Sequence, residues 1–317
     1  MSTTEDPASA DVDVVIVSYR TPDLVLDCID SVLAAGAESV TVVDNASGDE
    51  TVERIVAEHP SVRLLVNERN VGYGAAANAG AATGDAPVIL VLNGDTLVRP
   101  GALQAFDHHF RNAPRSALVG PTIRRTDGSL QHSTYPFPSL FDAILGETGL
   151  HLLIGRVGFL RERFHRTWSH DRVRSVDWVV GAAFAVRRSA FESVGGFDER
   201  YFMYSEEVDL CRRLHDAGHI VEFAPLTVVT HVGEASAKQH RDAMERERQA
   251  SAVRFLRSHA PPAQAIALLT FQRAVTALRA ARDAALSFVS RGHVRYRRRR
   301  EAAARWELVR ERELWIP

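Results

Sequence analysis

Three acidic side chains, Glu206, Glu207 and Asp209, stand within four positions of one another. The aromatic stretch from Tyr201 to Tyr204 directly precedes them. Burial beside aromatic rings disfavours the charged form of a carboxyl, so one of these acids could have a pKa near neutrality and act as a general base. The alternative interpretation is structural, because the helix dipole favours acids in the first turn of a helix.

A further acid, Asp95, follows Asn93 and Gly94 directly after the apolar run Val88–Leu92. A carboxylate at the end of a strand suits Mg²⁺ or Mn²⁺ shared with substrate phosphates, although a capping Asp in a turn has the same sequence pattern. His231 closes a later apolar run. It is either a second metal ligand or a histidine at a strand end.

Two loops have the composition of nucleotide-binding segments. The loop from Asp44 to Asp49 is either a polar pocket for a nucleoside or an Asx turn that leads into a helix. The segment Gly72–Ala77 mimics the dinucleotide fingerprint, but Asn67–Val71 separate it from the preceding apolar run. A nicotinamide site needs its first glycine directly after the strand, so the spacing argues against an oxidoreductase.

These residues follow a regular alternation of strands and helices. Apolar, β-branched runs predict strands, helical spacing predicts helices, and their alternation predicts an α/β fold with a mainly parallel sheet. The polar residues, Ser18 and Tyr19 among them, gather just after the strands, where open α/β sheets bind ligands. The expected strands are Val12–Ser18, Ser39–Val43, Val62–Val66 and Val88–Leu92, and the expected helices are Asp23–Ala35, Glu50–His59 and Gly74–Ala82.

The second half of the chain has a weaker pattern. Thr126–Ser175 is expected to form long loops and short helices over the sheet. We then expect a strand over Trp178–Val186, a helix over Phe202–Ala217 and a strand over Ile220–Thr230. Residues 1–11 are expected to be disordered, 12–236 to form one catalytic domain, and 237–317 to form a helical, Arg-rich extension.

Composition limits the class of protein. The chain has 317 residues, of which 45% are hydrophobic and 25% charged, as in an ordinary globular protein. This composition excludes a disordered protein and a small protein held together by disulfides. Cys28 and Cys211 lack partners at zinc-finger spacing and are expected to be buried thiols in a reducing cytoplasm. We expect no secretory leader and no membrane-spanning helix, because the start is polar and acidic and no apolar run of about 18 residues occurs.

The charge distribution is uneven although the formal net charge is −2. Residues from Gln272 onward hold twelve arginines and five acids, so their net charge is +7. The preceding residues have a net charge of −9. Six of these arginines stand between Arg291 and Arg300, after an apolar helical stripe. The pattern predicts that this C-terminal segment docks on an anionic membrane. The alternative is that the segment forms a helical hairpin packed on the catalytic domain. No nucleic acid is expected, because no base-stacking or groove-reading motif accompanies the cluster. The stripe consists of Leu268, Phe271, Val275 and Leu278.

Taken in order, these segments resemble family 2 of the inverting glycosyltransferases, which have the GT-A fold. The resemblance covers Val12–Ser236, and the ordered set is far more specific than any one motif. Asn93 stands where many members have the first Asp of the metal motif, and Glu207 stands where Asp is common as the base. The matching segments are Val14–Arg20 (first strand), Val42–Asp49 (nucleoside loop), Arg69–Asn78 (donor segment), Asn93–Asp95 (metal motif) and Ser205–Leu210 (base motif).

The resemblance implies a role for each matching residue. Asp95 and His231 would hold Mg²⁺ or Mn²⁺ on the donor diphosphate, and Glu207 would be the catalytic base. The donor site would be lined by Ser18, Tyr19, Asp44, Asn70, Gly72, Asn78 and Asn93, and the acceptor side by Trp178, Gly181, Glu206 and Asp209.

Within the family, the segments around Trp178 and Gly196 are similar to the rhamnosyltransferase branch. This similarity implies transfer of L-rhamnose from dTDP-L-rhamnose to polyprenyl-diphosphate-linked N-acetylglucosamine, at the inner face of the plasma membrane. The alternatives are a galactofuranosyl or glucosyl donor, a UDP-sugar, a metal-dependent nucleotidyltransferase and a non-catalytic sugar-nucleotide-binding adaptor. A homo-oligomer is compatible with the sequence.

Overall fold

The computed structural model describes residues 10–148, 168–233 and 241–316, which form two compact units. The sheet unit comprises Met1–Pro136 and His165–Gln239, and the helical unit comprises Phe137–Phe164 and His240–Pro317. The described residues 137–148 thus group with the C-terminal helices rather than with the sheet. Of the N-terminal segment expected to be disordered, residues 1–9 lie outside the described residues.

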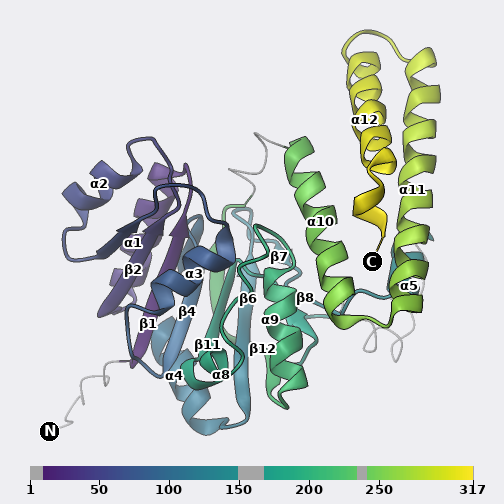
Figure 1. Ribbon diagram of the computed structural model, residues 1–317. Helices are drawn as coiled ribbons and strands as arrows, with labels where there is room; N and C mark the ends of the chain where they lie inside the picture. The colour runs from purple at the N-terminus through teal and green to yellow at the C-terminus, as the bar shows by residue number, and fades with distance from the viewer. Residues whose placement is uncertain (1–9, 149–167, 234–240, 317) are drawn as a thin grey trace, which may run out of the picture. The chain divides into compact units, whose positions relative to one another are not determined.

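The sheet unit is built on one large mixed sheet in the order β3-β2-β1-β4-β11-β6-β12-β5 (Figure 1). Strands β3, β2, β1 and β4 are parallel, as are β6 and β12, whereas β11 and β5 run antiparallel to their neighbours. The expected α/β architecture is confirmed. The strands are β1 (Val12–Ser18), β2 (Ser39–Asp44), β3 (Arg63–Val66), β4 (Val88–Asn93), β5 (Thr96–Val98), β6 (Ser116–Arg124), β7 (Leu130–Gln131), β9 (Arg174–Ser175), β11 (Ala183–Arg187) and β12 (Ile220–His231), with β8 (Thr134–Tyr135) and β10 (Trp178–Val179) in a separate small sheet.

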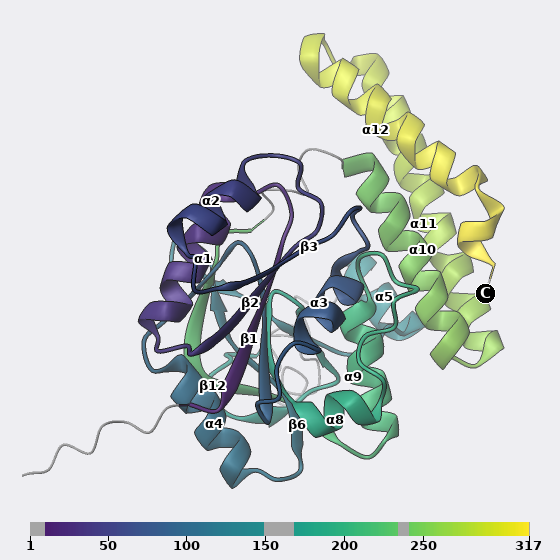
Figure 2. The same cartoon turned by 60° about the vertical axis from the view of Figure 1, so that its left-hand side comes forward.

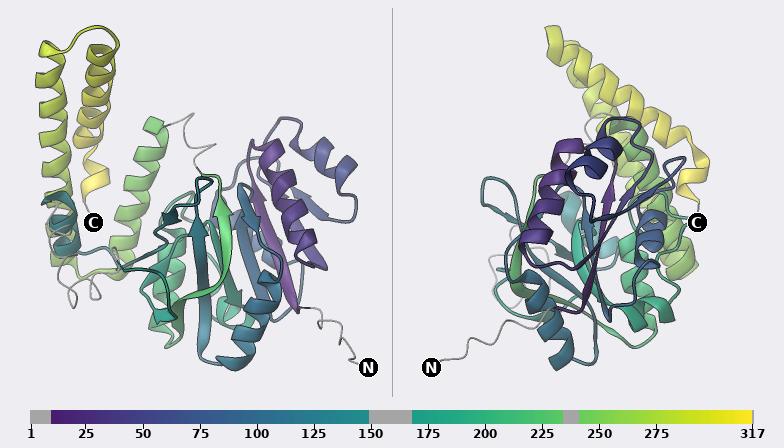
Figure 3. Two further views of the ribbon diagram at one scale, coloured as in Figure 1. Left: turned by 180° about the vertical axis from the view of Figure 1, so that it is seen from behind. Right: turned by 90° about the vertical axis from the view of Figure 1, so that its left-hand side faces the viewer.

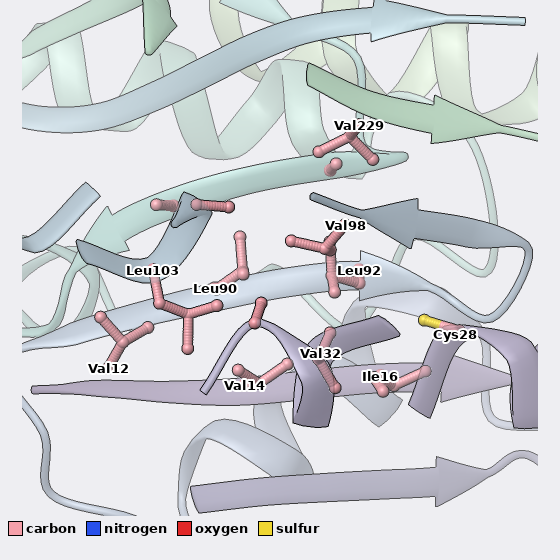
Figure 4. Close-up of a cluster of buried hydrophobic side chains, with 14 of the residues drawn as sticks. Val12, Val14, Ile16, Cys28, Val32, Leu90, Leu92, Val98, Leu103 and Val229 are labelled. Carbon is pink, nitrogen blue, oxygen red and sulfur yellow. The ribbon is translucent and has the colours of Figure 1, made fainter. Parts of the chain in front are cut away.

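Helices cover both faces of the large sheet (Figures 1 and 2). One hydrophobic core lies beneath α1 and α4, and the other lies beneath α3, α8 and α9. Alternate residues of β1 enter opposite cores: Ile16 packs with the first and Val15 with the second, which explains the unbroken apolar run (Figure 4). The helices are α1 (Pro22–Ala34), α2 (Thr51–Glu58), α3 (Tyr73–Ala81), α4 (Ala102–Asn112), α8 (Arg188–Ser193) and α9 (Glu206–Asp216).

Both cysteines are free and buried, as expected. Cys28 lies on α1 in the first core, and Cys211 lies on α9 in the second. They are therefore apolar packing groups within the sheet unit.

Two expectations about local structure are wrong. The strand expected over Trp178–Val186 is interrupted between β10 and β11, which belong to different sheets. The helix expected from Phe202 begins only at Glu206, because Tyr204 and Ser205 have positive φ angles of 66° and 65°. A left-handed residue cannot continue a right-handed helix, so α9 starts directly after them.

The helical unit contains α5 (Leu140–Thr148), α10 (Arg241–His259), α11 (Pro262–Val289), α12 (Gly292–Arg310) and the 3₁₀ helix η2 (Arg312–Trp315). Helices α11 and α12 run antiparallel as a hairpin (Figure 3, left). The apolar stripe expected on this segment is divided, since Leu268 is buried while Leu278 is 70% exposed. In the part of the chain that the structure describes, no helix is long and apolar enough to span a membrane.

Candidate active site

The start of α9 is backbone-strained and places two acids in the first turn of the helix. Tyr204 and Ser205 are among five non-glycine residues with positive φ angles, and Glu206 and Glu207 follow them at once. Such strain costs about 1–3 kcal/mol per residue and is found mostly where a site requires it. The sequence pattern alone predicts a helix through this point, so the left-handed turn indicates a functional constraint.

Glu207 has the environment of a general base. Its side chain is largely buried, and among the described residues its Oε2 has no hydrogen-bond partner. Burial raises its pKa from 4.5 to about 7, although backbone hydrogen bonds near Gly181, Ser205 and Val208 act in the opposite direction. A carboxyl with such a pKa exchanges protons readily at neutral pH.

The backbone at Gly181 packs directly on Glu207. A Cβ atom at Gly181 would lie 3.5 Å from the Cβ of Glu207, and the Gly181 carbonyl accepts a 2.7 Å hydrogen bond from the Tyr73 hydroxyl. Burial and the negative charges of Glu206, Glu207 and Asp95 raise the pKa of Tyr73 well above its usual value. Tyr73 therefore remains a protonated donor that fixes the turn between β10 and β11 beside Glu207.

The other two acids at the start of α9 have different surroundings. Asp209 is buried, and its carboxylate accepts a 2.7 Å hydrogen bond from Arg213 and a 3.5 Å hydrogen bond from Tyr201. Arg213 also donates to the carbonyls of Val194 and Gly196. Asp209 thus anchors the segment that leads into α9. Glu206 is 5% exposed and lies beside the base in the sequence.

Asp95 and His231, expected to be metal ligands, lie side by side. Asp95 Oδ1 is 3.3 Å from His231 Nε2, and the Asp95 carbonyl accepts a hydrogen bond from the backbone amide of Val232. His231 Nδ1 lies 3.0 Å from Oε1 of Gln131, on β7. An amide oxygen can only accept, so Nδ1 donates in this contact, which orients the ring with Nε2 toward the Asp95 carboxylate.

The pair fits a divalent cation. A carboxylate oxygen and an imidazole nitrogen are both ligands of divalent cations, and ligands at right angles around Mg²⁺ lie about 3 Å apart, close to the 3.3 Å that separates these two atoms. Within residues 10–148, 168–233 and 241–316, no cluster of three or more His, Cys, Asp or Glu side chains could hold a metal. Substrate oxygens would have to complete the coordination, which is typical of cations that bind together with a diphosphate.

At the end of β2, the carboxylate of Asp44 is buried and orders the loop that follows. It accepts hydrogen bonds from the Ser47 amide at 3.0 Å and the Ser47 hydroxyl at 2.5 Å. Ser47 in turn accepts from the backbone amide of Arg20 at 2.9 Å. The two strand-end loops, after β1 and after β2, therefore form one connected surface.

Asn45 joins this surface to the segment that precedes α3. Its amide group donates to Asn70 Oδ1 at 2.9 Å and to the Gly72 carbonyl at 3.1 Å, and it accepts from the backbone amide of Val71. Asn70 Oδ1 also accepts from the Gly72 amide. Asn45 was not singled out as a donor-site residue on its own, because only the folded chain brings these segments together.

Gly72 and Asn78 connect α3 with the chain that leads to α9. Gly72 has a φ of 92°, and a Cβ atom there would lie 2.3 Å from the Phe202 carbonyl oxygen. The Asn78 amide donates to the Phe197 carbonyl and to Glu199, and it accepts from the Phe197 amide. These contacts show Asn78 holding the turn before α9.

The remaining expected residues lie at strand ends or on the small sheet. Ser18 is buried, and its hydroxyl has no hydrogen-bond partner among the described residues. Tyr19 lies under the guanidinium of Arg20, and Asn93 ends β4. Trp178 stacks on the Tyr135 ring at 4.9 Å and donates to the Pro136 carbonyl.

The structure therefore brings Asp95 to His231, Glu207 to Gly181, and Asp44 into one loop system with Asn70 and Gly72. Sequence reasoning did not identify Tyr73, Gln131 or Asn45. Tyr73 and Asn45 stood inside segments that the sequence did single out, whereas no pattern pointed to Gln131.

Comparison with known proteins identifies the family of the chain. Residues 8–250 match the family described as "Glycosyltransferase like family 2". An N-acetylglucosaminyl-diphospho-decaprenol L-rhamnosyltransferase of Mycobacterium tuberculosis is 38% identical over 208 residues, which is 61% of this chain and 66% of that protein, just under two thirds of its length. Rhamnosyltransferase WbbL of Escherichia coli is 27% identical, with 69% of this chain and 82% of that protein covered.

Solved structures show the same fold. A mannosyltransferase from Pyrobaculum calidifontis, in complex with GDP-Man and Mn²⁺, has a TM-score of 0.56 at 18% sequence identity. The match covers 98% of this chain and 89% of the mannosyltransferase chain. GalNAc-T7 with UDP, GalNAc and Mn²⁺ has a TM-score of 0.55 at 16% identity, with 80% and 48% covered. The sheet and its flanking helices thus have the GT-A arrangement.

Proposed function

The chain belongs to family 2 of the glycosyltransferases, and we propose on that basis that it moves a sugar from a nucleotide-sugar donor to an acceptor hydroxyl with inversion. The observation that carries this proposal is that two kinds of functional group lie near one side chain, since the charges of Glu207 and Asp95 both act on Tyr73. Glu207 has the pKa of a base, and Asp95 with His231 offers an oxygen and a nitrogen ligand. A transferase needs both functions: a proton acceptor and a binding point for the leaving diphosphate.

The reaction is a single displacement. The ionised carboxylate of Glu207 accepts the proton of the acceptor hydroxyl while that oxygen forms a bond to the anomeric carbon. The bond between the anomeric carbon and the diphosphate oxygen breaks at the same time, and its electron pair leaves with the nucleoside diphosphate. Attack opposite the leaving group inverts the anomeric centre. Asp95 and His231 would hold a divalent cation, which would stabilise the negative charge on the leaving diphosphate.

The binding roles follow from the positions of the loops. The loop ordered by Asp44 and Asn45 would hold the nucleoside, and the buried hydroxyl of Ser18 is a ready hydrogen-bond partner for the donor. Tyr19, Asn70 and Asn93 stand at the neighbouring loop and strand ends. Trp178 and Gly181 would flank the acceptor beside Glu207.

Similarity to the mycobacterial relative supports L-rhamnose, carried by dTDP, as the sugar and a polyprenyl-diphosphate-linked N-acetylglucosamine as the acceptor. Galactofuranosyl and glucosyl donors, or a UDP carrier, remain the competing assignments. The Mn²⁺ in the related solved structures supports a divalent cation, either Mn²⁺ or Mg²⁺. A lipid-linked acceptor would place the enzyme at the inner face of the plasma membrane.

A donor screen tests this proposal. The full chain would be incubated with Mn²⁺, a short polyprenyl-diphosphate-N-acetylglucosamine and each of several nucleotide sugars, and the lipid product analysed by mass spectrometry. We expect the mass of one sugar to be added with release of nucleoside diphosphate. Release of inorganic diphosphate would indicate a nucleotidyltransferase, and donor binding without product across the whole screen would indicate an adaptor.

A further inference from the structure

The turn that joins α11 to α12 exposes apolar side chains. Phe288 is 73% exposed, Val289 79% and Tyr296 67%, while Leu286 and Val294 are exposed to 37% and 44%. Single exposed apolar residues are common on protein surfaces, but five within eleven positions at the end of one hairpin are not. We call residues 286–300 the hairpin tip. It lies at the end of the hairpin opposite η2 (Figures 1 and 3).

Two basic side chains lie among the apolar ones of the hairpin tip, and four more follow them. Arg291, Arg295 and Arg297–Arg300 carry six positive charges, and the sequence from Ser290 to Arg300 holds no acid. Arg297 is five residues past Gly292, where α12 begins, so the basic run starts about 8 Å along the helix axis. This offset matches the depth of about 5–10 Å to which apolar side chains enter the boundary of a lipid headgroup layer.

The hairpin tip is held in shape by its own contacts. The guanidinium of Arg295 donates to the Ser290 carbonyl at 2.7 Å and to the Phe288 carbonyl at 3.3 Å, so it caps the end of α11. Further along the hairpin, buried Asp283 of α11 is paired with Arg305 of α12. The apolar and basic groups are therefore presented on a preformed support, which reduces the entropy lost on docking.

We propose that the hairpin tip docks on an anionic lipid surface, with Phe288, Val289 and Tyr296 entering the headgroup boundary and Arg297–Arg300 contacting lipid phosphates. The exposed aliphatic residues Val289 and Val294 favour lipid over nucleic acid, because aliphatic side chains neither contact phosphates nor stack on bases. The inference rests on the proposed function in one respect: a lipid-linked acceptor would be met at such a surface. It also moves the docking site away from the apolar stripe around Leu268, because that residue is buried within the helical unit.

Sedimentation of the full chain with vesicles tests the proposal. Vesicles of phosphatidylcholine with 0 to 40% phosphatidylglycerol would be compared at low and high salt. Each arginine near an anionic surface strengthens binding by about fivefold, so changing the four residues Arg297–Arg300 to Ser should weaken it by up to about 600-fold. Phe288→Ser with Val289→Ser should also weaken it by at least about tenfold. The matched control is Leu278→Ser, an equally exposed residue of α11 outside the hairpin tip, which should change binding by less than about twofold.

A second experiment measures directly which residue enters the lipid, and it does not require a variant that has lost vesicle binding. In Phe288→Trp, the added fluorescence should be quenched by brominated acyl chains, and in Leu278→Trp it should not. The proposal is overturned if the Phe288 and Val289 variant binds vesicles like the wild type, if the two Trp variants are quenched equally, or if duplex DNA competes fully with the vesicles. Transfer to a water-soluble acceptor should be unchanged in all these variants, so failure of docking can be told apart from failure of the proposed activity.

Discussion

Replacing Glu207 by Gln should make the protein more stable above pH 7 while lowering its activity. The folded state raises the pKa of Glu207 from 4.5 to about 7, so between these values the folded chain binds more protons than the unfolded chain. The contribution of the protonated carboxyl to stability is therefore complete below pH 4.5 and lost as the pH rises through 7. At 1.36 kcal/mol for each pKa unit, the ionised carboxylate costs at most about 3 kcal/mol above pH 7.

Gln resembles the protonated acid and does not titrate. The free energy of unfolding of Glu207→Gln should thus equal that of the wild type near pH 4 and exceed it by up to about 3 kcal/mol at pH 8. Urea unfolding at several pH values measures this difference. Glu222 is a matched control of opposite sign, since its hydrogen bond with His109 lowers its pKa and Glu222→Gln should destabilise the protein at neutral pH. A difference for Glu207→Gln that does not change with pH would refute the reasoning.

Three further changes test the surroundings of the base. Asp95→Ala should lower transfer by about 10²-fold or more, and excess EDTA should abolish wild-type activity until Mn²⁺ is restored; full activity in EDTA would exclude the metal role. Gly72→Ala should lower the free energy of unfolding in urea more than Gly48→Ala does. Both positions have a positive φ, which alone costs about 1–2 kcal/mol, but only at Gly72 would the added Cβ lie 2.3 Å from the carbonyl oxygen of Phe202. Equal losses of stability in the two variants would contradict this close approach. Tyr73→Phe should cost about 1–3 kcal/mol, as the Gly181 carbonyl loses its 2.7 Å partner, and should lower kcat more than donor affinity; a larger loss of affinity would show that Tyr73 binds donor instead.

The sheet could be predicted closely because its signal is local. β1 matches its expected bounds, and β2 and β4 differ by one residue at their ends, since each apolar run is filled by cores on both faces. The break between Trp178 and Val186 could not be predicted in this way. Its turn is fixed by the hydroxyl of Tyr73, 108 residues away in the sequence, and no local pattern carries that contact.

The candidate site also has parts that the sequence could predict and parts that it could not. Asp95 and His231 could be paired from the sequence because Asp95 lies just past one strand end and His231 at another, and strand ends meet at one edge of the sheet. Gln131, which orients His231, lies 100 residues before it on a two-residue strand that has no pattern of its own. Likewise, the left-handed turn at Tyr204 and Ser205 could not be inferred from residue types that are ordinarily compatible with a helix.

The pH dependence of transfer tests the central claim, that Glu207 is the base, most directly. For the wild type, log kcat/KM should rise with a slope of one below pH 7 and level off above it, following ionisation of the Glu207 carboxyl. In Glu207→Gln the rate should be about 10² to 10⁴-fold lower at pH 8 and independent of pH across this range, with donor affinity retained. A Glu207→Gln variant that keeps the wild-type rate and the wild-type inflection near pH 7 would contradict the account.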